Sequence, residues 1–367
     1  MKLGEEILRP VHAFLDGIWR EDRILIVYHP DPDGVCAAVL FLKALKEPET
    51  IHVLNQGTCV TITDETLKRV KEKGYNKVII VDLNVENDVE SVRKLASLFN
   101  HLLIVDHHVS TGLLKREEGN ITYINPCQLG FASGDKYPAS KLSYDMLREW
   151  DKSMEKWDWI AAIGVVGDSA DDFWADFIRD VCARRGVERN NIEMAARIIE
   201  FCRAKSYDLV EKALYILNVC NTLPDFLKSE VVKDVGDMER EYRKLTESVK
   251  RDYEDDEIVI IRIHTKYNMK SIVANSLSKN RFPHKTLVVI WEDETNYHLS
   301  LRRQDRRVDM NALAKNVIDR VKVGEGGGHV PAAGARIPKH SIHLEELKRV
   351  IIEEHNKLVS GGVILLP

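Results

Sequence analysis

Aspartate and histidine side chains follow three short apolar runs of the sequence, each at the point where the run ends. Asp31 and Asp33 come after RILIVYH, Asp82 ends KVIIVD, and Asp106 and His107 follow HLLIV. Carboxylates gathered in one crevice repel one another and raise their own pKa values unless cations neutralise them. If the three groups meet, their chemistry predicts a site for divalent metal ions.

Three further residues extend this set: His29 before Asp31, His108 after His107, and Asp168 after the apolar pattern WDWIAAIGVVG. Oxygen ligands with one or two imidazoles suit Mn²⁺ better than Mg²⁺, and structural Zn²⁺ would favour cysteine. Two metals ~3.5 to 4 Å apart, bridged by a carboxylate and a water, would deprotonate that water and stabilise a phosphoryl displacement. The predicted chemistry is therefore hydrolysis of a phosphate ester.

Apolar runs alternate with amphipathic patterns from residue 23 onward. The strand patterns cover 23–29, 51–55, 77–83 and 101–108, and the helix patterns cover 35–46, 64–74 and 88–99. Continuous β-branched runs of this kind predict a parallel sheet covered on both faces, in an α/β doubly wound domain. Ligands of such sheets bind outside the carboxyl ends of the strands, so the three groups should converge.

The second half of the chain is expected to be helical over 137–252 and then α/β again. The charged stretch 234–257 is typical of a long solvated helix, which either joins two lobes or lies plainly on the surface. Later strand patterns cover 257–263, 286–291 and 297–302, and helix patterns cover 268–279, 309–321 and 344–358. We expect a catalytic domain with a helical extension over 1–200, a helical linker over 201–256 and a smaller α/β substrate-binding domain over 257–367.

Composition sets limits on function and location. The net charge of −5 over 367 residues argues against a nucleic-acid binder with a broadly basic surface. The six cysteines form no CxxC pair, which is typical of reduced thiols, and no apolar run approaches the ~18 residues that span a bilayer. The sequence predicts a folded cytoplasmic protein that does not insert into a membrane.

Simpler explanations exist for single parts of the aspartate and histidine set. Pro32-Asp33-Gly34 is a good turn signature, and Asp82 could cap a helix. Two adjacent histidines and a carboxylate after a strand serve no common packing purpose. The conjunction of three strand ends with the same ligand chemistry favours the metal site.

These motifs resemble those of the DHH phosphoesterases, a family that includes RecJ-type exonucleases, nanoRNases, cyclic-dinucleotide phosphodiesterases and some inorganic pyrophosphatases. The resemblance covers nearly the whole chain. The four motifs match His29-Pro30-Asp31-Pro32-Asp33-Gly34, Val81-Asp82, Asp106-His107-His108 and Gly167-Asp168.

The resemblance implies roles for these residues. Two Mn²⁺ ions would be bound, with Mg²⁺ or Co²⁺ as substitutes, by Asp31, Asp33, Asp82, His107 and Asp168. Asp82 would bridge the two ions, Asp106 would ligate or orient, and His108 would face the substrate phosphate. The family's first histidine often stands four residues before the first aspartate, whereas His29 stands two before Asp31. Asp171 and Asp172 compete with Asp168 as ligands, and Asp168 is preferred because it directly follows the apolar helix and glycine.

A glycine-rich segment near the C-terminus resembles the GGGH signature of the domain that accompanies the nucleotide-cleaving family members. It comprises Gly326, Gly327, Gly328 and His329, followed by AAG. Three glycines allow backbone N–H groups to approach a phosphate and form an anion-binding nest, whereas the plain alternative is a flexible loop. The segment is therefore expected to bind substrate.

A strand end upstream carries the arginine pair Arg302-Arg303, which resembles the family's backbone-holding segment. Alternation places Arg302 on the face of His298 and Ser300, with Arg303 pointing away. Arginine suits bidentate phosphate recognition, so Arg302 is the predicted phosphate ligand. With Arg306 and Arg307 the pair is expected to form a basic patch.

The substrate is expected to be short. The pyrophosphatase branch resembles only the first domain, and no run of short strands indicates an oligonucleotide-binding barrel. We therefore predict a manganese-dependent nuclease of RNA degradation that converts 5′-phosphorylated short RNA or DNA, including linear dinucleotides such as pApA, to mononucleotides. The alternatives are an exonuclease for longer single strands, a phosphoadenosine phosphate or cyclic-dinucleotide hydrolase, and an inactive replication-fork scaffold. A replication or repair partner and the oligomeric state, a dimer included, stay open.

Overall fold

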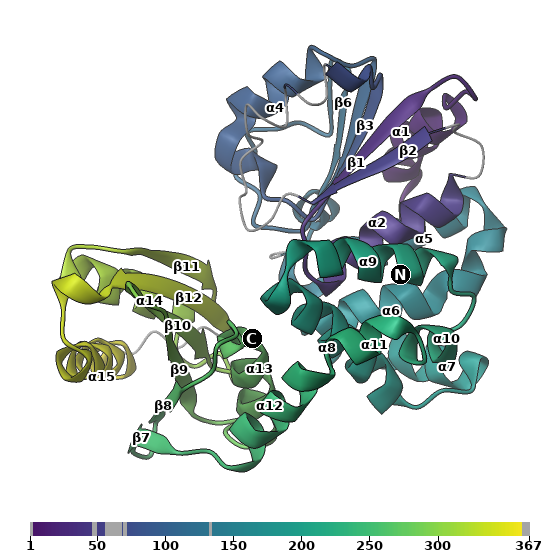
Figure 1. Cartoon of the computed structure of the whole chain (residues 1–367). Coiled ribbons are helices and arrows are strands. Elements are labelled where there is room, and N and C mark those ends of the chain that lie inside the picture. Colours follow the sequence, from purple (N-terminus) through teal and green to yellow (C-terminus); the bar gives the residue numbers. More distant parts are fainter. Residues whose placement is uncertain (1–2, 46–49, 56–67, 69–71, 132–133, 362–367) are drawn as a thin grey trace. The chain divides into compact units, whose positions relative to one another are not determined.

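The computed structural model describes residues 3–45, 50–55, 68, 72–131 and 134–361. The chain divides into two compact units, Met1–Asp234 and Val235–Pro367, and each is described by itself (Figure 1). The predicted helix over 64–74 lies almost wholly outside the described residues.

The first unit is built on a six-stranded sheet with the order β2-β1-β3-β4-β6-β5. All pairings are parallel except that of the short edge strand β5. The strands are β1 (Arg23–Tyr28), β2 (Thr50–Asn55), β3 (Lys77–Val81), β4 (His101–Val105), β5 (Glu117–Glu118) and β6 (Ile121–Ile124). This confirms the predicted doubly wound α/β domain.

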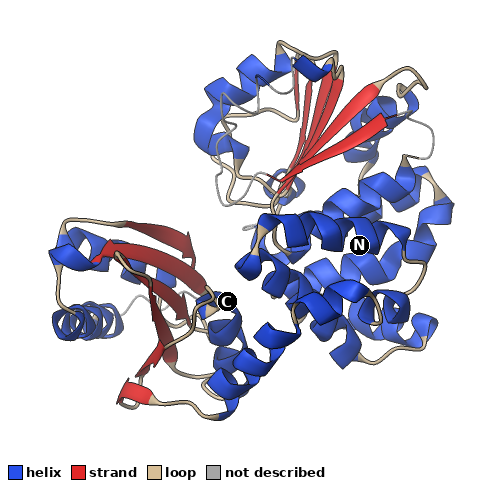
Figure 2. Ribbon diagram, viewed as in Figure 1, coloured by secondary structure: helices blue, strands red, loops and turns tan. Residues whose placement is uncertain are grey.

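Helices cover both faces of this sheet (Figure 2). On one face α4 (Val89–Ala96) packs Val92 and Leu95 against strand residues such as Val27 and Ile80. The other face is covered by α1 (Glu5–Asp16), α2 (Pro32–Ala44) and α5 (Ala139–Trp150), each of which contacts strands of the sheet. Burial on both faces explains the continuous apolar runs of these strands, since neither side meets water.

The remainder of the first unit is helical, as predicted for the region after residue 137. Three of its helices, α6, α8 and α9, pack against α2 or against one another. No helix among the described residues is long and apolar enough to cross a membrane. The helices are α6 (Asp158–Gly167), α7 (Ala175–Arg185), α8 (Arg189–Lys205), α9 (Tyr207–Val219), α10 (Leu223–Leu227) and α11 (Glu230–Asp234).

The second unit has its own six-stranded sheet, ordered β11-β12-β10-β9-β8-β7, in which only β8 and β9 are parallel. Its strands are β7 (Arg251–Glu254), β8 (Ile258–Ile263), β9 (Thr286–Glu292), β10 (Asn296–Arg302), β11 (Glu325–His329) and β12 (Ala332–Pro338). The helices are α12 (Gly236–Glu247), α13 (Lys270–Asn280), α14 (Met310–Val321) and α15 (Leu344–Ser360). A core that joins β8, β9, β10 and β12 to α14 and α15 confirms the smaller α/β domain.

One local prediction was wrong, and one plain alternative is excluded. The charged stretch 234–257 is not one helix, because α12 ends at Glu247 and edge strand β7 follows. Tyr253 of β7 packs against the apolar core of the second unit. The many charged residues around it do not indicate this tertiary contact. The glycine-rich segment is not a loop, because it pairs with β12 as strand β11.

Candidate metal centre

The point where the chain reverses direction in the first sheet gathers the predicted ligands. From β1 the chain passes to β2 on one side and then to β3 on the other, so that β1 and β3 are neighbours. Crevices at such switch points, outside the carboxyl ends of the strands, are where α/β sheets bind ligands. His29 follows β1, Asp82 follows β3, and the Asp106-His107-His108 motif follows β4.

One group of possible metal ligands consists of His29, Asp31 and Asp82, whose ligand atoms lie within 4.8 Å of one another. His29 Nδ1 lies 3.0 Å from Asp31 Oδ2 and 3.5 Å from Asp82 Oδ2. Asp31 is held in place because it caps α2, accepting a hydrogen bond of 3.0 Å from the Gly34 amide. A side chain at Gly34 would clash, since its Cβ would lie 2.2 Å from the carbonyl oxygen of His29.

A second group consists of Asp82, His107 and His108. His107 Nε2 lies 3.2 Å from Asp82 Oδ1, on the opposite oxygen from the one that faces His29. Asp82 therefore belongs to both groups, the position that a carboxylate bridging two cations requires. His108, predicted to face substrate, lies with this group.

Hydrogen bonds to the outer nitrogens fix both imidazoles. His107 Nδ1 lies 3.2 Å from the carbonyl oxygen of Gly134, and His108 Nδ1 lies 2.7 Å from Asp106 Oδ1. A carbonyl or carboxylate oxygen only accepts, so each Nδ1 is the donor and carries a proton. Nε2 is then the nitrogen that would bind a metal once the metal displaces its proton, because nearby carboxylates outweigh burial and raise the pKa of both imidazoles. Asp106 thus orients His108 in this structure, one of its two predicted roles.

Asp33 is braced by the first turn of α5. Its Oδ2 accepts a hydrogen bond of 2.7 Å from the Ala139 amide, and its Oδ1 accepts one of 2.9 Å from the Ser140 amide and another from the Ser140 hydroxyl. The N-terminal end of a helix favours a negative charge. Asp33 Oδ2 lies 3.8 Å from His107 Nε2, which brings the carboxylate to the second group.

Asp168 reaches the cluster at the C-terminal end of α6. Its Oδ2 lies 3.7 Å from His107 Nδ1. Close packing of α6 brings it there, because a Cβ at Gly164 would lie 2.1 Å from Ser140 Oγ. The competing Asp171 is buried and forms an ion pair with Arg189 on α8, which leaves Asp168 as the acidic group of this motif at the cluster.

The buried polar atoms of this cluster fit a pair of divalent cations. Asp106 Oδ2 is buried and has no hydrogen-bond partner among the described residues, although such atoms are normally satisfied, and His29 Nδ1 faces the carboxylates of Asp31 and Asp82. Asp82 also has a φ of 57°, a strained left-handed conformation that concentrates at functional sites. Oxygen and imidazole ligands, which make up both groups, suit Mn²⁺.

Two carboxylates of this cluster, Asp33 and Asp168, hold protons more tightly than usual, whereas burial of Asp31 is outweighed by the charge of His29, which lowers the pKa of Asp31. Burial, followed by the charge of Asp82, raises the pKa of Asp33 to about 7. Burial likewise raises the pKa of Asp168 well above its ordinary value, against the effect of His107. For His29 burial lowers the pKa, but the charge of Asp31 outweighs it and the pKa rises to about 10. A cation that bound here would therefore displace protons from the cluster.

We expect metal binding to depend on pH. The pKa of Asp33 is about 7 in the metal-free folded protein, against an ordinary value of 3.8. Between these two pH values the folded protein therefore keeps a proton on Asp33 that the unfolded chain has lost. The free energy of unfolding should then fall as pH rises through this window. Mn²⁺ competes with the proton, so it should raise the melting temperature more at about pH 8 than at about pH 5. Differential scanning fluorimetry tests this. The Asp33→Asn variant serves as control, and an equal pH slope in both proteins would contradict the assignment.

Three residues of this site were not predicted. Gly134 and Ser140 hold His107 and Asp33 from a segment without any motif that the sequence analysis recognised. Arg203 on α8 is three-quarters buried and pairs with Glu200 at 2.9 Å. Burial lowers the pKa of Arg203, but the charges of Glu200 and Asp31 raise it above its ordinary value. Only the fold of α8 brings this cation near the carboxylates.

The predicted substrate residues lie in the second unit. Gly326, Gly327, Gly328 and His329 form edge strand β11, and the Gly328 amide donates a hydrogen bond of 3.1 Å to Asn311 Oδ1. The glycines are needed for strand packing, because a Cβ at Gly326 would lie 2.5 Å from the Gly334 carbonyl oxygen. The extended backbone excludes the flexible loop that was the plain alternative for this segment.

The two arginines at the end of β10 lie in different environments, so they do not form the predicted basic patch together. Arg302 is half-buried, and its Nε donates to Asn275 Oδ1 at 2.5 Å. Arg303 does not belong to a surface patch, because it is 1% exposed and forms ion pairs with Asp305 and Glu257. The side chain that points away from Arg302 enters an internal ion-pair network, which strand alternation alone does not reveal.

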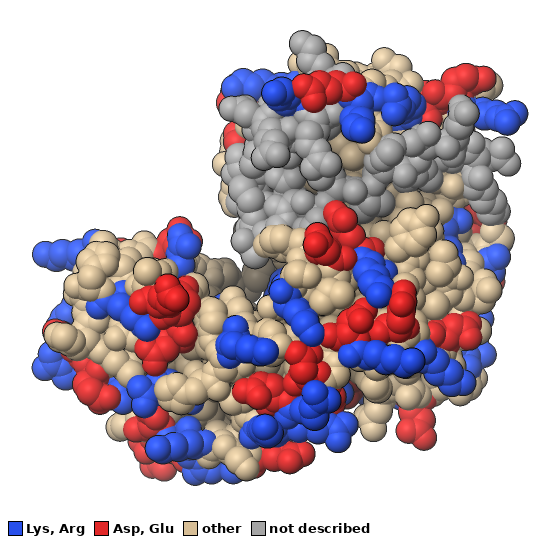
Figure 3. All heavy atoms as spheres, viewed as in Figure 1, with Lys and Arg blue, Asp and Glu red and all other residues tan. Residues whose placement is uncertain are grey.

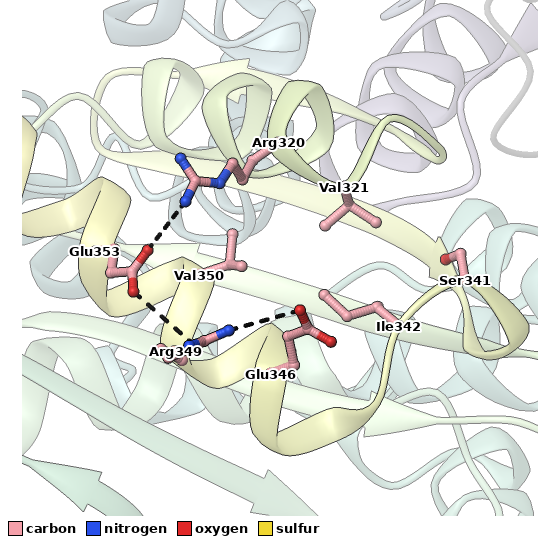
Figure 4. A pocket seen from close by; sticks show the side chains of 8 residues that line it. All are labelled: Arg320, Val321, Ser341, Ile342, Glu346, Arg349, Val350 and Glu353. Atoms are coloured by element: carbon pink, nitrogen blue, oxygen red, sulfur yellow. Dashed lines mark hydrogen bonds and ion pairs between the residues drawn. The ribbon is translucent and has the colours of Figure 1, made fainter.

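A cavity of about 220 Å³ lies between α14 and α15 in the second unit (Figure 4). Its charged lining is self-paired, with Arg320 3.4 Å from Glu353 and Arg349 3.6 Å from Glu346. None of the predicted site residues lines it. It contributes nothing to the metal centre.

Comparisons with family models match two parts of the chain. The DHH family, N-terminal domain, matches residues 23–164, and the DHHA1 domain matches residues 255–358. No curated protein matches the chain.

Solved structures share the fold at low sequence identity. A DHH-domain protein described as a member of a family of ribosomal proteins has a TM-score of 0.72 at 15% identity, over 97% of this chain and 93% of the other. Exonuclease RecJ bound to manganese has a TM-score of 0.62 at 15% identity, over 98% of both chains. CDC45 from Entamoeba histolytica has a TM-score of 0.52 at 11% identity, over 97% of this chain and 100% of the other.

Proposed function

We propose that this chain, which belongs to the DHH phosphoesterase family, is a manganese-dependent phosphodiesterase. Its substrates would be short oligonucleotides, including linear dinucleotides such as pApA. The products would be mononucleotides. The observation that carries the proposal is the pair of ligand groups that share Asp82. Two cations at about 3.5 to 4 Å are the usual arrangement for displacement at a phosphodiester.

The chain's own residues have distinct tasks in this proposal. His29 and Asp31 would hold one cation, His107 with Asp33 and Asp168 the other, and Asp82 both. When bound, the ions supply the positive charge that makes a water nucleophilic at neutral pH and stabilises the oxygens of the displacement. Arg203, beside the carboxylates, adds a fixed positive charge that suits a substrate phosphate.

Charge distribution supports a short substrate. Lysine and arginine are interspersed with aspartate and glutamate over the face drawn in Figure 3, outside its grey residues, without a broad basic field. Long single strands are bound mainly through many phosphate contacts on positively charged grooves. A net charge of −5 fits a substrate held at a few points. Arg302 and the segment Gly326 to His329 are our candidates for those points.

The proposal is tested with labelled pApA and Mn²⁺, using the wild type and the variants Asp33→Ala and His107→Ala. We expect hydrolysis by the wild type only, because both variants remove groups at the cluster. A matched control is Asp88→Asn, which keeps the cap of α4 because asparagine also caps helices. Equal activity in all four proteins would refute the assignment of hydrolysis to this cluster and would favour the non-enzymatic alternative, an inactive scaffold.

Substrate length is a separate prediction. With Mn²⁺ we expect dinucleotides and about five-residue oligonucleotides to be cleaved at least about tenfold more efficiently than about 30-residue DNA or RNA, because the acidic protein offers few phosphate contacts. The measurement is kcat/KM over a panel that includes cyclic dinucleotides and phosphoadenosine phosphate. Faster cleavage of the long strands would instead support the second candidate, a RecJ-like exonuclease. The similarity in fold to exonuclease RecJ, which extends over 98% of both chains, favours this candidate.

A further inference from the structure

An exposed group of aromatic rings lies on the two loops that flank His107. We call Phe131, Phe173 and Trp174, with Lys136 at their edge, the aromatic platform. The ring centroids of Phe131 and Phe173 are 6.3 Å apart, and those of Phe173 and Trp174 are 5.4 Å apart. Phe173 is 51% exposed and Phe131 is half-buried, so the platform presents apolar ring surface to solvent.

Buried side chains support the platform from below. Tyr137 is fully buried, contacts both Phe131 and Trp174, and donates a hydrogen bond of 2.5 Å to Asp145. The ammonium of Lys141 lies 4.1 Å from the centroid of Trp174 and forms an ion pair with Asp145. The Trp174 indole donates a hydrogen bond of 2.7 Å to the Lys136 carbonyl, which ties the two loops together.

Both loops also contact the metal centre. Phe131 precedes Gly134, whose carbonyl oxygen lies 3.2 Å from His107, and three residues span at most about 11 Å. Phe173 follows Asp168, whose carboxylate lies 3.7 Å from the same imidazole, and five residues span at most about 18 Å. The platform thus lies within the reach of a short oligonucleotide whose phosphodiester is at the cluster.

We propose that the aromatic platform is a nucleobase-binding subsite next to the scissile phosphodiester. A base stacks on the exposed ring of Phe173, and the ring of Phe131, which is inclined by 69° to that of Phe173, contacts the edge of the base. This rests on the proposed function. Every base has a π-face, so aromatic rings bind single strands without regard to sequence. Lys136, whose ammonium lies 5.9 Å from the Phe173 ring, adds a positive charge at the edge for the phosphate backbone. The exposed Asp172 beside Phe173 disfavours a phosphate at the ring itself, which leaves the base as the group that fits.

The test compares a short oligonucleotide with the same strand carrying an abasic site next to the scissile bond. We expect the wild type to prefer the intact strand by about tenfold or more in kcat/KM. In Phe173→Ala this preference should shrink towards one, while cleavage of the abasic strand stays at the wild-type rate. Phe131→Ala should act in the same direction. The control Tyr215→Ala removes a ring that is 71% exposed on α9 and should keep the full preference.

A binding measurement separates this inference from the proposed function. Stacking quenches the fluorescence of 2-aminopurine, so we expect quenching of a 2-aminopurine oligonucleotide by the wild type and by Tyr215→Ala, and less by Phe173→Ala. Quenching without hydrolysis would keep the subsite and refute the phosphodiesterase. Hydrolysis with the same base preference in wild type, Phe173→Ala and Phe131→Ala would refute the subsite.

Discussion

Replacement of Asp82 by asparagine is expected to reduce Mn²⁺-dependent hydrolysis by at least about 100-fold. Loss of a group that merely orients a metal ligand typically costs about 10- to 100-fold, and Asp82 belongs to both ligand groups. Its two oxygens face His29 and His107, at 3.5 and 3.2 Å, so one change weakens both cation positions. The measurement is kcat/KM on labelled pApA, together with Mn²⁺ binding by calorimetry.

The Asp82→Asn variant is suited to this test because its backbone is expected to survive. Asp82 has a φ of 57°, and asparagine is among the few residues that tolerate this left-handed conformation. Asp88→Asn is the matched control, as a change of the same chemistry in a helix cap. If Asp82→Asn kept wild-type activity and bound two Mn²⁺ ions, the shared-ligand assignment would be wrong.

The second large effect is expected from Gly134→Ala. A Cβ at this position would lie 1.6 Å from the carbonyl oxygen of His107, so the loop must move. The movement breaks the contact of 3.2 Å that holds His107 Nδ1, and the imidazole loses its fixed orientation. We expect activity to fall about 10- to 100-fold, the usual effect of losing such an orienting partner. Steady-state hydrolysis with Mn²⁺ titration measures it.

Gly236→Ala is the matched control for this substitution. Gly236 begins α12, and its added Cβ would lie 3.8 Å from Arg240, an ordinary contact. Alanine should therefore leave activity unchanged and stabilise the fold by about 0.4 to 1 kcal/mol. Circular dichroism shows whether both variants keep their secondary structure. Wild-type activity in a folded Gly134→Ala protein would show that the carbonyl does not position His107.

The local pattern of the sequence predicted the strands β1, β3 and β4 and the metal-site side chains that stand at their ends. Apolar runs such as KVIIV form buried strands because both faces of the sheet are covered, and Asp82 therefore stands at a strand end. Parallel strands bring their carboxyl ends to one edge. The convergence of His29, Asp82 and His107 was thus predictable from strand type alone.

Long-range contacts carried information that the local pattern lacked. Tyr253 forms part of an edge strand in a stretch whose charges are typical of a solvated helix, because it packs on the core of the second unit. Arg303 is buried because Asp305 and Glu257 come together around it. The glycines of β11 form a strand because β12 approaches them closely. Glycine-rich composition alone is equally compatible with a loop.

The sequence by itself determined the α/β plan and the acidic and imidazole groups gathered at the sheet edge, because both follow from strand periodicity and residue chemistry. Only the tertiary structure decided how those groups are held. Gly134 fixes His107, Ser140 braces Asp33, and Arg203 approaches Asp31 through helices distant in sequence. Orientation and charge balance depend on distances between segments that no local pattern encodes, so the supporting residues of the site became visible only in the fold.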